Sequence, residues 1–268
     1  MKKRRVPRLL HPYKEWAINT LFPMKTVELD QLKFRYLRKD SPPHNPNDFA
    51  TGIEFHQRLG ELTGRVAIDI GANIGSYTLP LARRFKDVTA FEPSKVHCRL
   101  LRLNISLNNL RNVHVHEVAL SDSDGIMPLY IRSGGATSLD EKHYGLTYDR
   151  TLPVKTARLD SFLSKFQELD FMKIDAEGLE LRILQGGFQL ISSRKPIIAM
   201  EVHRPRIVLD GSCRCSVCDW LRGLAYVIDV TGESSSVGEV HWVWARPEKE
   251  VDSANPATNT EPALEPGG

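Results

Sequence analysis

The chain contains 268 residues, of which 41% are apolar and 26% are charged, and its formal net charge is +3. This length and composition suit one domain with a sizeable core, and no apolar run approaches the roughly 18 residues that a membrane-spanning helix needs. Positions 1–14 hold six basic residues and no acidic one, so the rest of the chain carries a net charge of −3. Because proteins whose main surface binds nucleic acid usually show a basic face, we expect no nucleic-acid partner.

The N-terminal part, residues 1–48, is predicted to be an accessory segment. Its basic start is not followed by a continuous apolar stretch, so we expect neither secretion nor a membrane span. We expect a cytoplasmic location instead. The pattern predicts a short helix over Lys14–Phe22, a hairpin within Thr26–Leu37 and a turn-rich linker over Ser41–Asp48. We expect this segment to cover a substrate pocket, and a helix over Phe49–Leu62 to open the main domain.

The stretch around which the chain is organised is V-A-I-D-I-G-A-N-I-G, residues 66–75. A β-prone apolar run enters a glycine-rich turn, and an amphipathic helix is predicted over Ser76–Phe85, as in a nucleotide-binding strand–turn–helix unit. The next predicted strand ends at Glu92, 21 positions after Gly71. Such folds place there the acid that accepts hydrogen bonds from ribose hydroxyls, so the two signals support each other.

The spacing of the glycines indicates which nucleotide is bound. A dinucleotide site has G-x-G-x-x-G, with a central glycine that lets the backbone approach a pyrophosphate, whereas Asn73 stands at that position here. S-adenosylmethionine carries no phosphate and needs a close turn and polar groups, which Asp69, Asn73 and Glu92 would supply. The pattern favours this cofactor over a nicotinamide or flavin dinucleotide, and over a plain turn whose glycines merely permit tight packing.

Strands and helices alternate from Val66 onward, which predicts an α/β fold with an open, mostly parallel sheet. A helix is predicted over Ser94–Leu107 and a strand over Val113–Ala119. The loop that begins at Glu117 is expected beside the adenine ring, and Glu117 is assigned to cofactor binding. An insertion with two strands follows between Gly125 and Leu159, and we assign it to the substrate rim because long loops in compact domains are usually functional or disordered.

An acidic segment follows the predicted strand Phe171–Ile174. Lys173, Asp175 and Glu177 lie at its carboxyl end, which is the edge where open α/β sheets bind ligands, and a helix is predicted over Leu179–Leu190. Capping of that helix would explain one of the acids. It would not explain all three ionisable residues together, so we favour a functional site.

The predicted strand Pro196–Val202 delivers His203 to the same edge. A histidine there is a plausible proton acceptor because its ordinary pKa lies near neutrality, and a role in ordering the following loop is equally compatible. Closing antiparallel strands are predicted over Ala225–Val230 and Val240–Trp244. The Pro-, Asn- and Glu-rich tail, residues 246–268, is predicted to be disordered.

Three of the four cysteines, Cys213, Cys215 and Cys218, lie within six positions, and Cys98 stands alone. A zinc site would need a fourth ligand, and paired C-x-x-C motifs are missing. We therefore assign no metal ligands and interpret the three as reduced thiols at the start of a helix, which suits a reducing compartment. Metal binding by this cluster remains the less favoured alternative.

Several short motifs in the same order resemble the FkbM-type family of S-adenosylmethionine-dependent methyltransferases. They are V-A-I-D-I-G-A-N-I-G (66–75), F-E-P (91–93), Asn104 with Asn108, V-A-L-S-D (118–122), T-A-R-L-D-S-F (156–162), K-I-D-A-E-G-L-E (173–180) and M-E-V-H (200–203). The resemblance implies a class I methyltransferase fold over residues 49–245, with seven strands, helices on both faces and an antiparallel last strand. It also implies transfer of a methyl group to a hydroxyl oxygen of a sugar, a polyketide or a similar small molecule.

The resemblance also implies roles for individual residues. Carried over by position, the cofactor-binding residues are Asp69, Gly71, Asn73, Gly75 and Glu92. The signature acidic segment contains Lys173, Asp175 and Glu177.

An alcohol must lose its proton during attack on the methyl group, so the reaction calls for a general base. Our hypothesis is that His203 or Asp175 takes this proton and that Glu177 orients the substrate or the cofactor's amino group. A variant assisted by a divalent cation would use Asp175 and Glu201. Two alternatives from other classes are an NAD-dependent oxidoreductase on a similar fold and a non-catalytic, cofactor-binding scaffold.

Overall fold

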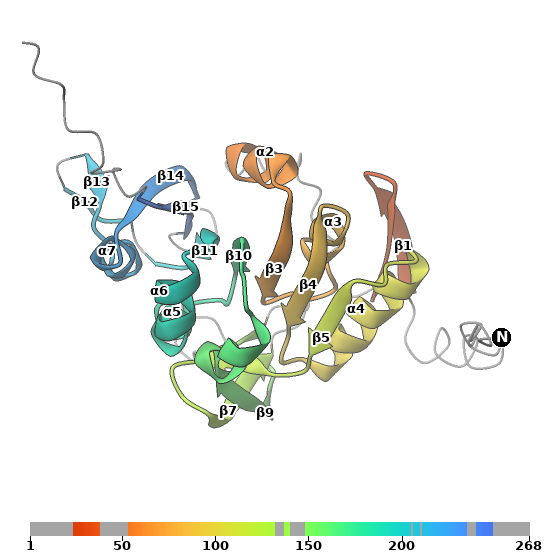
Figure 1. Cartoon of the computed structure of the whole chain (residues 1–268). Helices are drawn as coiled ribbons and strands as arrows, with labels where there is room; N and C mark the ends of the chain where they lie inside the picture. The colour runs from red at the N-terminus through yellow and green to blue at the C-terminus, as the bar shows by residue number, and fades with distance from the viewer. Residues whose placement is uncertain are drawn as a thin grey trace, which may run out of the picture.

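The computed structural model describes residues 24–37, 53–131, 137–139, 148–204, 206–209, 211–234 and 240–248. The described residues form a central sheet of seven strands in the order β14-β15-β11-β10-β3-β4-β5 (Figure 1). Its members are β3 (Gly64–Ile70), β4 (Phe85–Phe91), β5 (Val113–His116), β10 (Phe171–Ile174), β11 (Ile197–Val202), β14 (Tyr226–Ser234) and β15 (Val240–Pro247). Neighbouring strands from β5 to β11 are parallel, and β15 is antiparallel to both β11 and β14. The predicted sheet is therefore confirmed, including its antiparallel last strand.

Helices pack on both faces of this sheet. They are α2 (Ile53–Glu61), α3 (Thr78–Ala82), α4 (Lys95–Leu107), the 3-10 helix η2 (Leu159–Lys165), α5 (Glu180–Gly186), α6 (Phe188–Arg194) and α7 (Ser216–Gly223). Because side chains alternate along a strand, Ile68 and Ile70 of β3 join the core cluster of α5, α6 and α7, whereas Ala67 joins the cluster on the other face with Leu81 of α3.

Two predicted helices differ from their observed extents. The helix after the glycine-rich turn covers only Thr78–Ala82, because the chain must already enter β4 at Phe85. The helix predicted over Leu179–Leu190 is divided into α5 and α6 at Gly186 and Gly187. A Cβ atom on Gly186 would lie 2.0 Å from the carbonyl oxygen of Ser121, so this close approach of two backbones requires a glycine there.

A second, smaller sheet lies beyond the carboxyl ends of β3 and β4 (Figure 1). It consists of β6 (Ala119–Ser121), β7 (Gly125–Ile131), β8 (Thr137–Ser138) and β9 (Arg150–Arg158), in the order β6-β9-β7-β8. The two strands predicted for the insertion correspond to β7 and β9, which pair antiparallel. Leu120, Leu129 and Leu139 pack into the main core cluster, so this sheet is joined to the domain by apolar contact.

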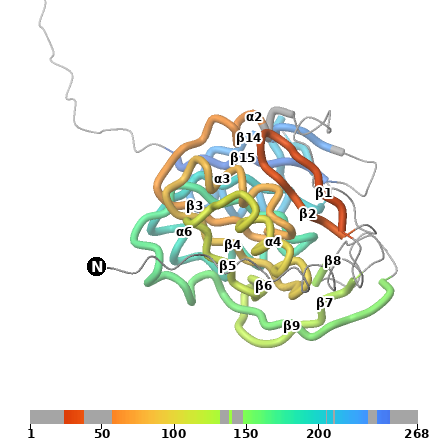
Figure 2. The backbone as a smooth tube through the Cα atoms, turned by 90° about the vertical axis from the view of Figure 1, so that its right-hand side faces the viewer, coloured from red at the N-terminus to blue at the C-terminus, as the bar shows by residue number. Residues whose placement is uncertain are grey.

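The N-terminal hairpin joins β1 (Met24–Leu29) to β2 (Leu32–Leu37) and packs beside α4 (Figures 1 and 2). Its two loop residues, Asp30 and Gln31, both have positive φ, as a tight two-residue hairpin turn demands. The hairpin lies behind the glycine-rich turn, where Leu32 and Phe34 contact Leu79 and Leu101. The described part of the accessory segment thus supports the cofactor turn instead of covering the cleft.

A last small hairpin pairs β12 (Val208–Leu209) with β13 (Ser212–Cys213). The predicted helix over Lys14–Phe22, the linker over Ser41–Asp48 and nearly all of the tail lie outside the described residues. The division into segments 1–48, 49–245 and 246–268 stays a prediction. Among the described residues, no helix combines the length and the apolar character needed to cross a membrane.

Candidate functional site

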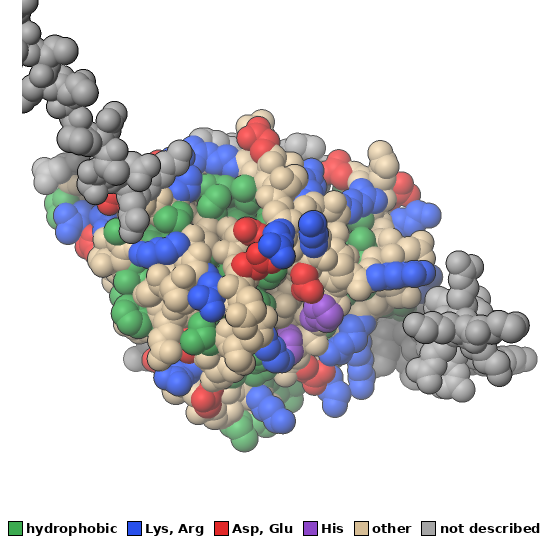
Figure 3. All heavy atoms as spheres, viewed as in Figure 1, with side chains coloured by type: hydrophobic (Ala, Val, Ile, Leu, Met, Phe, Trp, Pro, Cys, Tyr) green, Lys and Arg blue, Asp and Glu red, His purple; other side chains and the backbone are tan. Residues whose placement is uncertain are grey.

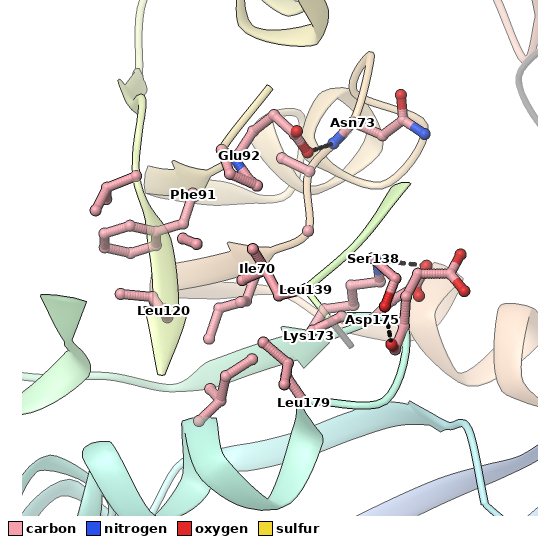
Figure 4. A pocket seen from close by; sticks show the side chains of 18 of the residues that line it. Ile70, Asn73, Phe91, Glu92, Leu120, Ser138, Leu139, Lys173, Asp175 and Leu179 are labelled. Atoms are coloured by element: carbon pink, nitrogen blue, oxygen red, sulfur yellow. Dashed lines mark hydrogen bonds and ion pairs between the residues drawn. The ribbon is translucent and has the colours of Figure 1, made fainter. Parts of the chain in front are cut away.

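A cleft of about 910 Å³, its open mouth included, lies at the carboxyl ends of β3, β4 and β10. Figure 4 shows that it has two different ends, with Phe91 and Leu120 on one side and Lys173 and Asp175 on the other. The cleft is lined by Ile70–Asn73, Ser76, Tyr77, Phe91–Pro93, Val118–Leu120, Leu129, Ser138, Leu139, Lys173, Asp175–Glu177, Leu179 and Ile183. Parallel strands present their carboxyl ends at one edge, which explains why segments distant in sequence meet here.

The glycine-rich turn forms one wall of the cleft. Gly71 has a φ of +76°, and a Cβ atom at this position would lie 1.8 Å from the backbone oxygen of Asp175. The backbone N–H groups of Gly71 and Ala72 both donate to the carbonyl oxygen of Phe91, at 3.0 and 3.1 Å, which fixes the turn to the end of β4. Only glycine permits this approach, so the turn brings backbone close to the cleft without a side chain in the way.

Glu92 is held in one orientation by its neighbours in the cleft (Figure 4). Its Oε2 accepts from the backbone N–H of Asn73 at 2.9 Å, and its Oε1 accepts from that of Ser94 at 2.8 Å. The residue is only 3% exposed. Each carboxylate oxygen has a further lone pair, so the group is a preorganised acceptor for hydroxyl donors such as those of a ribose.

Three of the residues assigned to cofactor binding do not line the cleft. Asp69 is fully buried beneath it and accepts a hydrogen bond from the hydroxyl of Thr78 at 2.5 Å. Gly75, with a φ of +102°, packs against Leu79. Glu117 faces Arg102, with 3.8 Å between Oε2 and Nη1. Gly71, Asn73 and Glu92 are the assigned residues that do line it.

Lys173 organises the charged end of the cleft. Its ammonium nitrogen lies 3.4 Å from Oδ2 of Asp175 and 3.7 Å from Oδ1 of Asp69, and 4.3 Å from the centre of the Tyr77 ring. Burial disfavours the charge, but Asp175, Asp69 and Glu201 outweigh that effect and raise the pKa of Lys173. A charged ammonium is therefore retained in the interior and orients the Asp175 carboxylate.

His203 lies beside the same carboxylates but is nearly buried. Its Nδ1 is 2.9 Å from Oε1 of Glu180, and its Nε2 is 3.6 Å from Glu177 and 3.9 Å from Asp175. Burial disfavours the imidazolium, yet the hydrogen bond to Glu180 and the charges of Asp175 and Glu177 raise the pKa of His203 to about 10. At neutral pH the ring is therefore protonated, and a protonated imidazole accepts no further proton.

Glu201 completes this group of charges. Burial, and then the neighbouring Asp175 carboxylate, raise the pKa of Glu201 to about 8, in spite of the nearby His203. Its Oε1 lies 3.8 Å from Nε2 of His203. Glu201 thus lies around the ring of His203 together with Asp175 and Glu177, which follow β10, and Glu180 of α5.

Asp175, Glu177 and His203 also place one oxygen or nitrogen each within 4.8 Å of one another, close enough to surround a divalent cation. Cation binding would need a neutral His203 with a free lone pair. The carboxylates around the ring favour its protonated form instead. A cation would have to displace that proton, so the variant assisted by a divalent cation stays an alternative prediction.

Tyr77 lines the cleft and was not expected to do so, whereas Ser138 and Leu139 belong to the insertion that was assigned to the substrate rim. Tyr77 lies two positions after Gly75, the last glycine of the turn. This short spacing could have indicated that its side chain lies at the cleft. Ser138 donates to the backbone oxygen of Glu177 at 2.9 Å, a contact from β8 that no local pattern indicates.

Comparison with known proteins agrees with this geometry. The family model described as "Methyltransferase FkbM domain" matches residues 69–226. The chain is 28% identical to methyltransferase sdnD of Sordaria araneosa, over 44% of this chain and 59% of that protein. It is 30% identical to a tRNA/tmRNA (uracil-C(5))-methyltransferase of Marinomonas sp., over 41% of this chain and 30% of that protein. The chain thus spans less than two thirds of these relatives.

Among solved structures, the chain resembles the methyltransferase FkbM of Methylobacillus flagellatus, with 18% identity and a TM-score of 0.49 over 70% of this chain and 46% of that one. The motifs that carried the resemblance, from the glycine-rich turn to the M-E-V-H segment, all fall within or beside the matched region. Because the family model matches more than half of the residues, the chain belongs to the family of FkbM-domain methyltransferases, with the mostly parallel, seven-stranded α/β fold of class I methyltransferases.

Proposed function

We propose that this chain uses S-adenosylmethionine to methylate a hydroxyl oxygen of a small molecule such as a sugar or a polyketide. The observation that carries the proposal is the cleft with two different ends. A preorientated carboxylate and an apolar wall lie at one end, and a charged group of ionisable side chains lies at the other.

The described residues fit the cofactor part by part. Glu92 would accept from the ribose hydroxyls, and the apolar side chains of Phe91 and Leu120 would contact the adenine ring. The backbone of the turn from Gly71 to Asn73 would lie against the methionine portion. When bound, S-adenosylmethionine supplies a methyl group whose bond to sulfur breaks as the acceptor oxygen forms the new bond to carbon.

Asp175 is the side chain that we assign as general base. It lines the cleft, and Lys173 holds its carboxylate in place at 3.4 Å. The acceptor hydroxyl would pass its proton to Asp175 during attack, while Glu177 orients the acceptor. His203, held as an imidazolium, stabilises these acids and does not compete for the proton.

A small-molecule acceptor suits the charge distribution better than a polynucleotide does. Beyond position 14 the chain is net negative, and on the face in Figure 3 basic side chains are spread out while acidic ones gather near the middle. Since one relative's name gives tRNA as its substrate, tRNA belongs in the acceptor screen. The four cysteines, none in a disulfide, accord with the cytoplasmic location that we also propose.

Titration calorimetry tests the cofactor assignment. We expect purified protein to bind S-adenosylmethionine and S-adenosylhomocysteine, and Glu92→Gln to weaken both about 10- to 100-fold. In the variant, the amide nitrogen would face a backbone N–H group and repel it, so the side chain would lose its fixed orientation. The cofactor would also lose hydrogen bonds to a charged group, which contribute about 1.5–3 kcal/mol each. Glu168→Gln, at the exposed partner of Arg65, is the matched control and should bind normally.

Absence of heat with both compounds would overturn the cofactor assignment. Transfer of labelled methyl groups should then be measured with sugars, polyketides and tRNA in parallel. Labelling of tRNA alone would contradict the small-molecule proposal while leaving the cofactor assignment intact.

A further inference from the structure

Four buried side chains with sulfur or nitrogen donors meet near the carboxyl end of β11, and none of them lines the cleft. They are Cys213, Cys215, Cys218 and His241. Their donor atoms all lie within 4.8 Å of one another, and none of the four residues is more than 3% exposed. The fourth ligand that the cysteine spacing lacked is thus supplied by β15, more than 20 positions further along the chain.

We propose that these four side chains bind a structural zinc ion. Zinc prefers four tetrahedral sulfur and nitrogen ligands, at about 2.3 Å for sulfur and about 2.0–2.1 Å for nitrogen. That geometry separates a sulfur from a nitrogen ligand by about 3.6 Å. The Nε2 atom of His241 lies 3.6 Å from Sγ of Cys213 and 3.5 Å from Sγ of Cys215, so the observed spacing matches.

The contacts around the ligands support the same assignment. The Nδ1 atom of His241 lies 3.1 Å from the carbonyl oxygen of Arg204, which accepts its proton. This bond fixes the tautomer in which the lone pair of Nε2 faces the three sulfurs, the usual arrangement of a zinc-bound histidine. A guanidinium nitrogen of Arg222 donates to the carbonyl oxygen of Cys213 at 2.6 Å, so a positive charge lies beside a site with three thiolates.

Local structure explains why the three cysteines converge. Cys213 ends the β12–β13 hairpin, Cys215 precedes α7, and Cys218 lies in the first turn of that helix. A hairpin followed at once by a helix turns the three side chains to one side. The backbone N–H groups at the start of a helix also favour negative charge, which suits thiolates.

Hydrogen bonds among neutral cysteine and histidine side chains would explain the close approach of these four donors less well than a zinc ion does. The single lone pair of Nε2 accepts one hydrogen, yet two sulfurs lie 3.5 and 3.6 Å from it. A zinc ion satisfies all four donors at once. It would also link the segment after β11 to β15, and through Arg204 it would steady the neighbouring His203.

Metal analysis of the full chain, purified without a chelator and after removal of any histidine tag, tests the proposal. We expect about one zinc ion per chain in the wild type and in Cys98→Ser, which alters a buried cysteine outside the cluster. Cys218→Ser and His241→Asn should lose most of the zinc. Wild-type protein without zinc, or full zinc in either cluster variant, would overturn the proposal.

A second measurement avoids variants that fail to fold. Cobalt exchanged into the wild-type chain should show the strong visible absorption of tetrahedral cobalt and thiolate charge-transfer bands in the near ultraviolet. A spectrum without thiolate bands, or a disulfide between two of the three cysteines in protein alkylated at lysis, would count against the site. Neither readout depends on methyl transfer, so the zinc proposal and the proposed function can fail separately.

Discussion

At the scale of single residues, the charge on His203 determines which side chain can take a proton. Two groups were candidates for the general base, and the raised pKa of His203 favours the other candidate, Asp175. The ring of His203 is surrounded by Glu180, Glu177 and Asp175, which keep it protonated. Asp175 lines the cleft, so the proposed reaction assigns the proton to it.

Replacing Asp175 with asparagine should therefore lower kcat about 10²- to 10⁴-fold, which is the usual contribution of a general base. Affinity for S-adenosylhomocysteine should change only a few-fold, since Glu92 and the turn are untouched. Single-turnover kinetics and calorimetry on the same preparation separate the two effects. Asp87→Asn is the matched control, because Asp87 is exposed beside His114 and outside the cleft.

The variant Glu177→Gln distinguishes the general base from the residue that orients the acceptor. If Glu177 orients the acceptor, its loss should raise KM more than it lowers kcat. Normal turnover in Asp175→Asn, together with a collapse in Glu177→Gln, would exchange the two roles.

The sequence predicted which residues lie at strand ends near the cleft, but it did not reveal the direction of side chains that lie within a strand. Gly71, Asn73 and Glu92 lie just beyond strand ends, where any side chain is near the cleft. Asp69 lies inside β3, where alternation turns it towards α3, so its position in the motif did not reveal its direction. The raised pKa of His203 depends on Glu180, a helical residue whose approach only the folded chain shows.

At the scale of elements, Asn104 on α4 and Asn108, which directly follows that helix, attach the N-terminal hairpin to the domain. Asn108 accepts from the N–H of Lys33 at 2.8 Å and donates to its carbonyl oxygen at 2.7 Å. Asn104 makes the same pair of contacts with Arg35 and also donates to the oxygen of Ile74 at 2.9 Å. Because residues four apart lie on one helical face, the two side-chain amides reach the same strand. They form hydrogen bonds with the backbone of β2 in the way that a neighbouring strand would.

Substitution of Asn104 by alanine should lower the free energy of unfolding by about 2–4 kcal/mol. It would remove the hydrogen bonds to the part-buried backbone groups of Arg35 and to the buried carbonyl oxygen of Ile74, and each buried group left unsatisfied costs about 1–3 kcal/mol. Urea titration measures this loss, and Arg99→Ala, at an exposed position of the same helix, should change little. Equal stability of the two variants would show that the hairpin is held by its apolar contacts alone.

Element boundaries were harder to predict than element types. Alternation and glycine spacing identified the strands of the main sheet. The break between α5 and α6 was not predicted, although Gly186 and Gly187 form a helix-breaking pair in the sequence. The sequence could not show that Gly186 also lies against the backbone of Ser121.

At the scale of the whole molecule, the largest gap between sequence and structure is the partner of the three cysteines. His241 approaches them only because β15 inserts between β11 and β14. Spacing within the cluster could not reveal a ligand delivered by the order of strands in the sheet. The mostly parallel sheet was predicted from the alternation of strands and helices, and its antiparallel last strand from the family resemblance, whereas the order of the strands was not predicted.

The buried histidine just beyond the carboxyl end of β11 also makes global stability depend on pH. The pKa of His203 rises from its ordinary 6.5 to about 10 on folding, so the unfolded chain releases this proton first. The stabilisation is complete below about pH 6.5 and is lost progressively as pH rises towards about 10. Glu201, with its pKa raised to about 8, acts in the same direction.

The free energy of unfolding should therefore fall by about 3 kcal/mol between about pH 7 and about pH 9, since one pKa unit corresponds to about 1.4 kcal/mol. Urea titrations with zinc present throughout would measure this slope without interference from metal loss. The slope should flatten in His203→Gln and persist in His114→Gln, which alters an exposed histidine at the far edge of the sheet. A wild-type stability that stays constant over this range would mean that His203 is neutral in the fold, and the proton in methyl transfer could then pass to its ring.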